Sequence, residues 1–244
     1  MLEAKNWTTF LQKFDGHNIE VACQFALKFK KNKVKIGGME FDINEDVISE
    51  AIGLPNIGEK YFKIKHFQEK SWVPFVMRSR VSSISWKNGT QRSWLVHPWD
   101  ELAYIIQNFV TCETRYSIIY LYHIKLLQHL RGDCMINLPH FLLKSLIKMS
   151  KKAQKQVEDV EKGISHCGII KIILTHELMK KGMTWTQFLI EKGFQSNVVQ
   201  ENEAVTKISD DDKNDVINPK TTCQKPSLAR RTLQAAQSNN SGEQ

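Results

Sequence analysis

The sequence lacks the motifs that mark the common catalytic and metal-binding proteins. Its 244 residues contain no Cys-x-x-Cys pair, no Gly-x-Ser-x-Gly, and no glycine-rich loop that ends in Gly-Lys-Ser or Gly-Lys-Thr. These are the usual signatures of structural zinc sites, serine hydrolases and phosphate-binding loops. His176-Glu177 begins like the metalloprotease motif His-Glu-x-x-His, but Lys180 stands in place of the second histidine. We therefore predict a protein that is not an enzyme and that holds no cofactor and no metal.

Long apolar runs are also missing, and the few cysteines are scattered. The most apolar stretch, residues 117–130, is too short to cross a bilayer and contains His123, Lys125 and His129. No basic and apolar leader opens the chain, and five widely spaced cysteines favour free thiols in a reducing compartment. We predict no membrane contact and a location inside the cell, in the nucleus or the cytoplasm.

What the sequence does have is an uneven positive charge. Residues 1–194 carry 28 Lys and Arg against 19 Asp and Glu, whereas residues 195–244 carry six against seven. The last fifty residues are also rich in Asn, Ser, Gln and Asp, without apolar periodicity, so they cannot bury enough surface to offset their chain entropy. We predict a compact domain over residues 1–194 and a disordered polar tail over residues 195–244.

The spacing of the apolar residues predicts a mainly α fold with one or two small β-hairpins. One hairpin is indicated around the turn Gly37-Gly38, and a second, from Ile84 to Trp94, around Asn88-Gly89. Apolar residues recur at helical spacing in segments that are bounded by Asn, Pro or Gly. These segments predict helices at 7–14, 19–29, 45–52, 98–109, 115–130, 139–163, 169–179 and 184–190.

The clearest local signal lies in residues 41–55, FDINEDVISEAIGLP. Asn44 is suited to the N-cap of a helix, and Gly53 with the proline that follows is suited to its end. Glu45 in the first turn complements the helix dipole, and Glu50 is expected in solvent. This stretch predicts a complete helix and suggests no chemistry.

Two lysine runs stand out, and only the first of them has more than one interpretation. Clustered lysines suit contacts with nucleic-acid phosphates or an import signal, but they are also typical of a helix end followed by an edge strand that lysine protects. The second run lies on the polar face of a predicted helix, as on any surface helix. The first run comprises Lys28, Lys30, Lys31, Lys33 and Lys35, and the second comprises Lys144, Lys148, Lys151, Lys152 and Lys155.

Four stretches resemble a plant family. They are VKIGGMEFDINEDVISEAIGLP, the segment around Trp94, Leu95 and Pro98 to Phe109, YSIIYLYHIKLLQHLRGDCMINLPHFLLKSLIKMS and SHCGIIKIILTHELMKKGM. Their order is similar to that of the plant transposon protein domain of retrotransposon-derived reading frames, which is akin to the plant mobile domain. The resemblance covers roughly residues 5–193. It implies an origin in a mobile element and a compact helical domain, and it brings no catalytic residue with it.

Two functions of different kinds are open at this point. The basic body favours a non-catalytic domain that binds DNA or RNA, with Lys28, Lys30, Lys31, Lys33 and Lys35 as the candidate contacts. The alternative is a gag-like module that self-associates through protein–protein contacts, or a relic with no retained activity. No small-molecule substrate is indicated.

Overall fold

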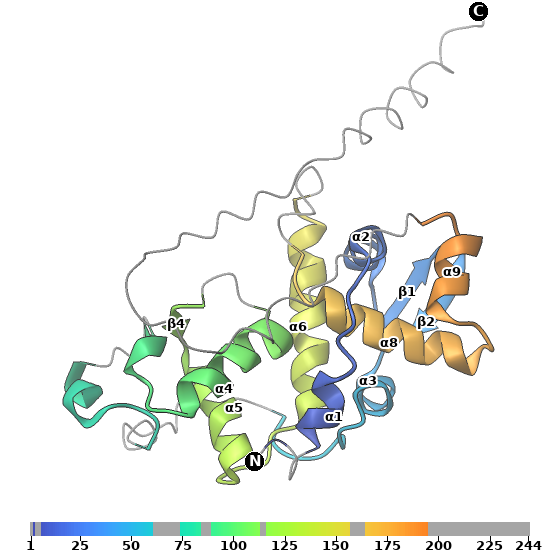
Figure 1. The fold of residues 1–244 in the computed structure, drawn as a ribbon. Coiled ribbons are helices and arrows are strands. Elements are labelled where there is room, and N and C mark those ends of the chain that lie inside the picture. The colour runs from blue at the N-terminus through green and yellow to red at the C-terminus, as the bar shows by residue number, and fades with distance from the viewer. Residues whose placement is uncertain are drawn as a thin grey trace, which may run out of the picture. The chain divides into compact units, whose positions relative to one another are not determined.

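The computed structural model describes residues 2, 6–60, 74–83, 89–112, 116–156 and 164–194. This part of the chain is mainly α, as predicted, and its strands form two small antiparallel sheets (Figure 1). The predicted tail, residues 195–244, lies outside the described residues.

Most of the elements in the described residues are helical. Among them, η4 and η5 are 3-10 turns and η6 is one turn of π-helix. In chain order the elements are α1 (Trp7–Leu11), α2 (Ile19–Lys28), β1 (Lys33–Ile36), β2 (Met39–Asp42), α3 (Glu45–Ile52), η4 (Arg78–Ser83), β3 (Thr90–Gln91), η5 (Arg92–Trp94), α4 (Trp99–Ile105), η6 (Ile106–Val110), β4 (Ile118–Ile119), α5 (Leu121–Arg131), α6 (Leu138–Ala153), α8 (Cys167–Lys180) and α9 (Trp185–Glu191).

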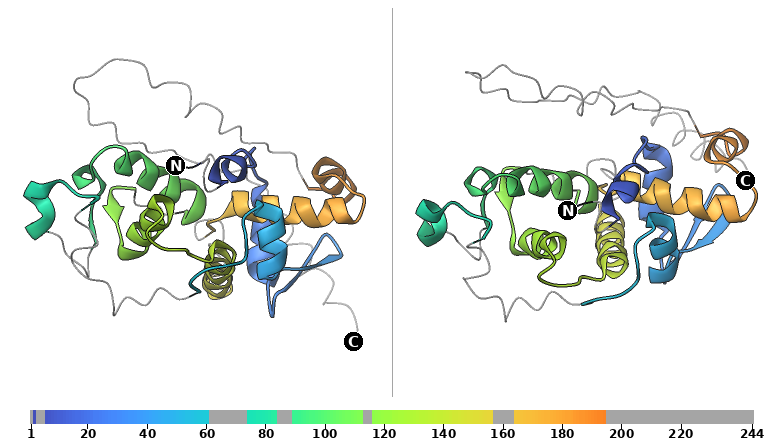
Figure 2. Two further views of the ribbon diagram at one scale, coloured as in Figure 1. Left: turned by 90° about the horizontal axis from the view of Figure 1, so that it is seen from below. Right: turned by 60° about the horizontal axis from the view of Figure 1, so that its bottom comes forward.

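Helix α6 lies between two groups of elements (Figures 1 and 2). In all three views α2, α3, α8, α9 and the β1–β2 hairpin lie on one side of α6, and α4, α5 and β4 lie on the other. The first group brings the start of the chain together with its later helices, since α3 packs against both α6 and α8. The core of the fold therefore depends on contacts between residues far apart in sequence.

Helix α3 forms as its local signals predict. The Asn44 side chain accepts a hydrogen bond from the Val47 backbone N–H at 2.9 Å, which caps the start of the helix. Gly53 ends it with φ of +75°, a left-handed conformation that glycine adopts without steric cost. Ser49 Oγ then donates to the Leu54 carbonyl at 2.6 Å. The sequence alone thus determines both ends of this helix.

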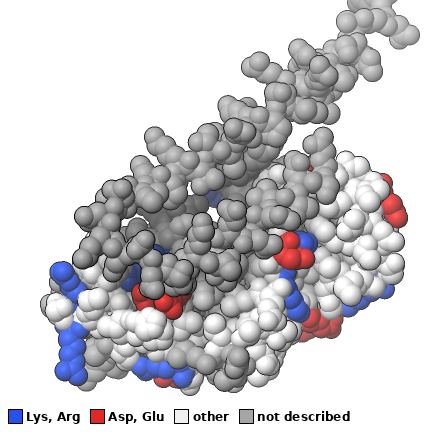
Figure 3. All heavy atoms as spheres, viewed as in Figure 1, with Lys and Arg blue, Asp and Glu red and all other residues white. Residues whose placement is uncertain are grey.

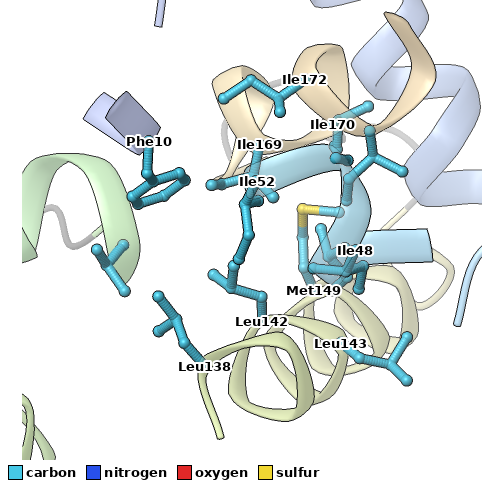
Figure 4. Packing of buried hydrophobic residues seen from close by; sticks show 14 of the residues in the cluster. Phe10, Ile48, Ile52, Leu138, Leu142, Leu143, Met149, Ile169, Ile170 and Ile172 are labelled. Atoms are coloured by element: carbon cyan, nitrogen blue, oxygen red, sulfur yellow. The ribbon is translucent and has the colours of Figure 1, made fainter. Parts of the chain in front are cut away.

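The centre of the core is formed by α3, α6 and α8 (Figure 4). Figure 4 shows Ile52 of α3 lying between Ile169 of α8 and Leu142 of α6, and all three side chains are fully buried. Helix α8 has buried apolar residues on most of its circumference, which is the pattern of a helix enclosed by neighbours on several sides. Its buried apolar residues are Ile169, Ile170, Ile172, Ile173, Leu174 and Leu178.

The helix predicted from about residue 115 begins later than expected. Ile118 and Ile119 form strand β4, which pairs with Thr90 and Gln91 of β3, and α5 starts only at Leu121. β-branched isoleucines fit a pleated strand well, but the strand forms here because a distant segment supplies its partner.

Within the described ranges, no helix is both long and apolar enough to cross a membrane.

Two other predicted elements need correction. Trp94 does not lie in a strand of a second hairpin; it belongs to the 3-10 turn η5, and residues 84–88 of that hairpin lie outside the described residues. The long helix predicted to reach Gly163 ends at Ala153, where the Gln154 N–H turns back to the Ser150 carbonyl. Residues 157–163 are also outside the described part of the chain.

The segment after α3 is hydrogen-bonded to the start of α6. The Glu59 N–H donates to the Met135 carbonyl at 2.8 Å, and the Asn137 N–H donates to the Glu59 carbonyl at 3.1 Å. Gly58 makes this approach possible, because a Cβ there would lie 2.7 Å from the Met135 carbonyl oxygen. The two backbones can therefore approach closely only with glycine at this position.

Side chains reinforce the same junction. The His140 ring donates through Nδ1 to Glu45 Oε1 at 2.7 Å, and Lys60 Nζ donates to Glu45 Oε2 at 2.7 Å. Asn137 donates to Asn56 at 2.8 Å. Glu45 therefore does more than complement the dipole of α3, because it joins α3 to α6 through a buried histidine.

Replacing Ile52 by aspartate should unfold the domain. The change places an unpaired charge at a fully buried position, at a cost comparable with the roughly 5–15 kcal/mol by which a typical domain is stable. Thermal melting followed by far-UV circular dichroism should show no cooperative transition. Ile190→Asp is the control, because Ile190 is 74% exposed. An unchanged melting temperature for Ile52→Asp would show that this face of α3 is not in the core.

Acid should weaken the junction through Glu45. Hydrogen bonds from His140 and, next, from Lys60 lower the pKa of Glu45 below its ordinary value of 4.5. Because the folded-state pKa is the lower one, the carboxylate stabilises the fold above pH 4.5, and this stability is lost as the pH falls through the lowered pKa.

Glu45→Gln should therefore be less stable than the wild type by roughly 1–3 kcal/mol at neutral pH. This difference should shrink as the pH falls below 4.5. Urea denaturation at a series of pH values measures both quantities. Glu20→Gln, which removes a carboxylate without an ion pair in the described residues, should show no such trend. A constant difference between Glu45→Gln and wild type across the series would contradict the assignment.

Candidate nucleic-acid interface

The structure places the five predicted contact lysines on the surface at one corner. Lys28 ends α2, and a tight turn follows in which Lys31 and Asn32 have φ of +49° and +62°. Lys30 and Lys33 close this turn through two reciprocal backbone hydrogen bonds of 2.9 Å. All five lysines are exposed. The local geometry therefore divides them into a group at the helix end and a pair on strand β1.

The pair on β1 has acidic neighbours. Lys33 Nζ donates to Glu40 Oε1 at 2.7 Å and lies 3.5 Å from Asp42 Oδ1 on strand β2. These contacts raise the pKa of Lys33 and lower that of Glu40, with the hydrogen bond between them as the main cause of both shifts. Lys35 also acts on Glu40 through its charge. For Lys33 and Lys35 the structure fits the interpretation of an edge strand protected by lysine.

The helix end is fixed by side chains that come from α6. Ser150 Oγ lies 2.7 Å from the Ala26 carbonyl and 3.1 Å from the Phe29 carbonyl, so its single hydroxyl proton is shared between two acceptors at the end of α2, with Ala26 the nearer. Gln154 Nε2 donates to the carbonyls of Leu27 and Phe29 at 3.1 and 3.3 Å, and to Ser150 Oγ at 3.0 Å. The C-terminal end of α6 is thus held against the C-terminal end of α2.

This contact brings the two lysine runs together. Gln154 lies among lysines on α6 and just after it, and the Phe29 carbonyl that it binds lies between Lys28 and Lys30. Within the described residues, none of these lysines makes a salt bridge. We name the combined patch the α2–α6 lysine surface: Lys28, Lys30, Lys31, Lys151, Lys152 and Lys155, all of them exposed.

The electrostatics of the α2–α6 lysine surface suit an anion. Two helices end there, and ammonium groups compensate the partial negative charge of a helix C-terminus. The six positive charges nevertheless exceed the partial negative charges of the two helix ends. The repulsion among these lysines is reduced when a phosphate binds beside them. In the sequence, Glu158, Asp159 and Glu161 follow Lys155, and these three residues lie outside the described part.

The α6 lysines are the part of this site that sequence reasoning missed. Lys151 and Lys152 lie on the exposed face of α6 as their spacing predicts, whereas Lys155 lies just beyond the end of the helix, and nothing local distinguishes these lysines from any other solvated face. The only signal near them was the pair Ser150 and Gln154, two polar residues close to the apolar face of α6. Ser150 is buried, and its hydroxyl finds its acceptor in another element, the Ala26 carbonyl of α2.

Two buried histidines, by contrast, have structural roles. His123 accepts the Tyr120 N–H at Nδ1 and donates from Nε2 to Thr111, at 2.9 and 3.1 Å, and burial lowers its pKa to about 3. His129 accepts the Ile136 N–H at 3.1 Å. Within the described ranges, no three His, Cys, Asp or Glu side chains are placed to hold one metal ion.

Comparison with known proteins gives no match for this chain. No family model matches the chain, and no curated protein and no solved structure gives a match. The resemblance to the plant transposon protein domain therefore stays a prediction that depends on the stretches quoted above.

Removing the hydroxyl of Ser150 should loosen the joint between α2 and α6. Ser150→Ala leaves the buried Ala26 carbonyl without its side-chain donor, while the Phe29 carbonyl keeps the Gln154 amide, and this should cost about 1–3 kcal/mol of unfolding free energy. Urea denaturation followed by tryptophan fluorescence measures the loss. Ser145→Ala on the same helix is the matched control and should change stability by less than about 0.5 kcal/mol. Equal effects of the two substitutions would rule out the bridging role of Ser150.

Proposed function

We propose that this domain binds nucleic acid by contacting backbone phosphates with the α2–α6 lysine surface. The observation that supports the proposal is the pair of hydrogen bonds from Gln154 to the Leu27 and Phe29 carbonyls, which brings two lysine runs to one place. The excess of nine positive charges in residues 1–194 acts in the same direction, because it attracts a polyanion over a longer range. The proposal includes no catalytic step.

Because all six cations of this surface are lysines, we expect it to contact phosphates rather than the edges of bases. An ammonium group is a compact point charge on a flexible stem, so it follows phosphates without reading the edges of bases. Binding through such contacts releases counterions and is largely independent of sequence. We therefore expect affinity for DNA and RNA alike, with a steep dependence on salt.

The test is a salt series with the full chain and a fluorescein-labelled duplex of about 20 base pairs. If all six lysines contact phosphates, the binding constant measured by fluorescence anisotropy should fall about a thousandfold between 50 and 200 mM salt. Lys30→Gln and Lys152→Gln should each weaken binding and reduce the slope of log K against log salt by about one.

Lys144→Gln is the matched control for this experiment. It removes the same charge from the same helix, but about two turns before Lys152, outside the α2–α6 lysine surface. For Lys144→Gln the slope of log K against log salt should stay at the wild-type value. Undetectable binding at low salt would overturn the proposal, and so would equal losses of affinity in Lys144→Gln and Lys152→Gln.

A further inference from the structure

A second surface, on the other side of α6, carries arginines against aromatic rings. The guanidinium carbon of Arg80 lies 5.5 Å from the ring centroid of Trp94, and that of Arg92 lies 4.7 Å from the ring of Tyr104. The rings of Tyr104 and Tyr116 meet edge to face at 5.8 Å. We name these five residues the arginine–aromatic surface. They come from η4, η5, α4 and the turn before β4.

The two tyrosines of this surface are open to solvent, whereas Trp94 is partly buried against the core. Tyr104 is 44% exposed and Tyr116 is 41% exposed, although rings of this size are worth more when they are covered. Arg80 is exposed as well, and so is its neighbour Arg78. Lys and Arg side chains, blue in Figure 3, gather at the left edge of the view, where Figure 1 places η4. The surface is therefore accessible, aromatic and positively charged.

Stacking distinguishes this surface from the α2–α6 lysine surface. A guanidinium is planar and weakly hydrated, so it stacks on rings and leaves its opposite face for another planar group. The Arg80 guanidinium carbon, 5.5 Å from the centroid of the Trp94 ring, lies within the distance of a cation–π contact. A nucleobase is a planar group of the right size, and unpaired bases stack on Tyr, Trp and Arg in many single-strand binding proteins.

The exposed rings, rather than the charges, select among anionic partners. Asp100 and Glu101 lie at the start of α4, with His97 3.9 and 3.6 Å from their carboxylates, so charge alone gives no preference for one polyanion over another. A peptide rich in carboxylates would find cations here but would gain nothing from the exposed rings. A base gains from both kinds of group, which favours nucleic acid as the partner.

We propose that the arginine–aromatic surface stacks with unpaired bases of single-stranded nucleic acid. This inference rests on the proposed function and adds to it, because it assigns the bases to one surface and leaves the phosphates to the other. In a duplex the bases are paired and stacked inside, so only the phosphate contacts remain. The domain should therefore prefer a single strand to a duplex of the same length.

The experiment compares two labelled oligomers of about 20 units by fluorescence anisotropy, with the full chain at low salt. One is oligothymidylate, and the other is an abasic deoxyribose-phosphate strand that carries the same phosphates without bases. The wild-type protein should bind oligothymidylate about tenfold more tightly or better, since stacking on one aromatic group is worth this much. Equal affinities would overturn the inference and leave phosphate binding intact.

Variants assign the preference to named residues. Tyr104→Ala should abolish most of the difference between the two oligomers, and Tyr104→Phe should keep it, because only the ring is required. Arg80→Lys keeps the charge but loses the planar group, so it should lower affinity for oligothymidylate alone. Ile190→Ala, at an exposed apolar position on α9, is the control and should behave as wild type.

The two proposals fail in different ways. Lys152→Gln should weaken binding of both oligomers by the same factor, because both carry phosphates. A protein that binds neither oligomer refutes the proposed function, and with it this inference. A Tyr104→Ala variant that keeps the full preference for oligothymidylate, with a circular dichroism melt like that of the wild type, refutes the stacking surface alone.

Discussion

The capping of α2 by α6 is the interaction on which the candidate site depends. A helix leaves its last carbonyl groups without partners, and when they are buried this is costly. In this fold the end of α2 obtains its donors from Ser150 and Gln154, in a helix more than a hundred residues later in the chain. One local requirement of hydrogen bonding therefore determines how two helices lie against each other. The positions of six lysines follow from it.

Much of the fold follows from signals that act over a few residues. Asn44 and Gly53 determine the ends of α3, and the two glycines of the first hairpin have the left-handed conformations that such a turn requires. By contrast, strand β4 exists only because β3 pairs with it, so the sequence around Ile118 indicated a helix. A strand that depends on a partner far away in the sequence need not show a pattern of apolar residues that identifies it as a strand.

The same distinction explains how much of the candidate site could be predicted. Cation clustering along the chain identified Lys28, Lys30 and Lys31, whereas the paired state of Lys33 depends on acidic residues across the hairpin. The contribution of the α6 lysines, and the placing of Arg80 over Trp94, arise from packing alone. The sequence of a charged segment does not reveal which charged residues of other segments will lie beside it in the fold.

The position of α8 in the core has a consequence for synthesis of the chain. Ile52 packs against Ile169, so the apolar face of α3 has no complete cover until α8 has left the ribosome. During that interval the nascent helices α2 and α3 present apolar surface, and closing so long a loop is slow compared with forming a helix. Truncation before Cys167 would yield a chain without α8. The first two-thirds of this protein should therefore depend on chaperones during translation, and the domain should appear in one late step.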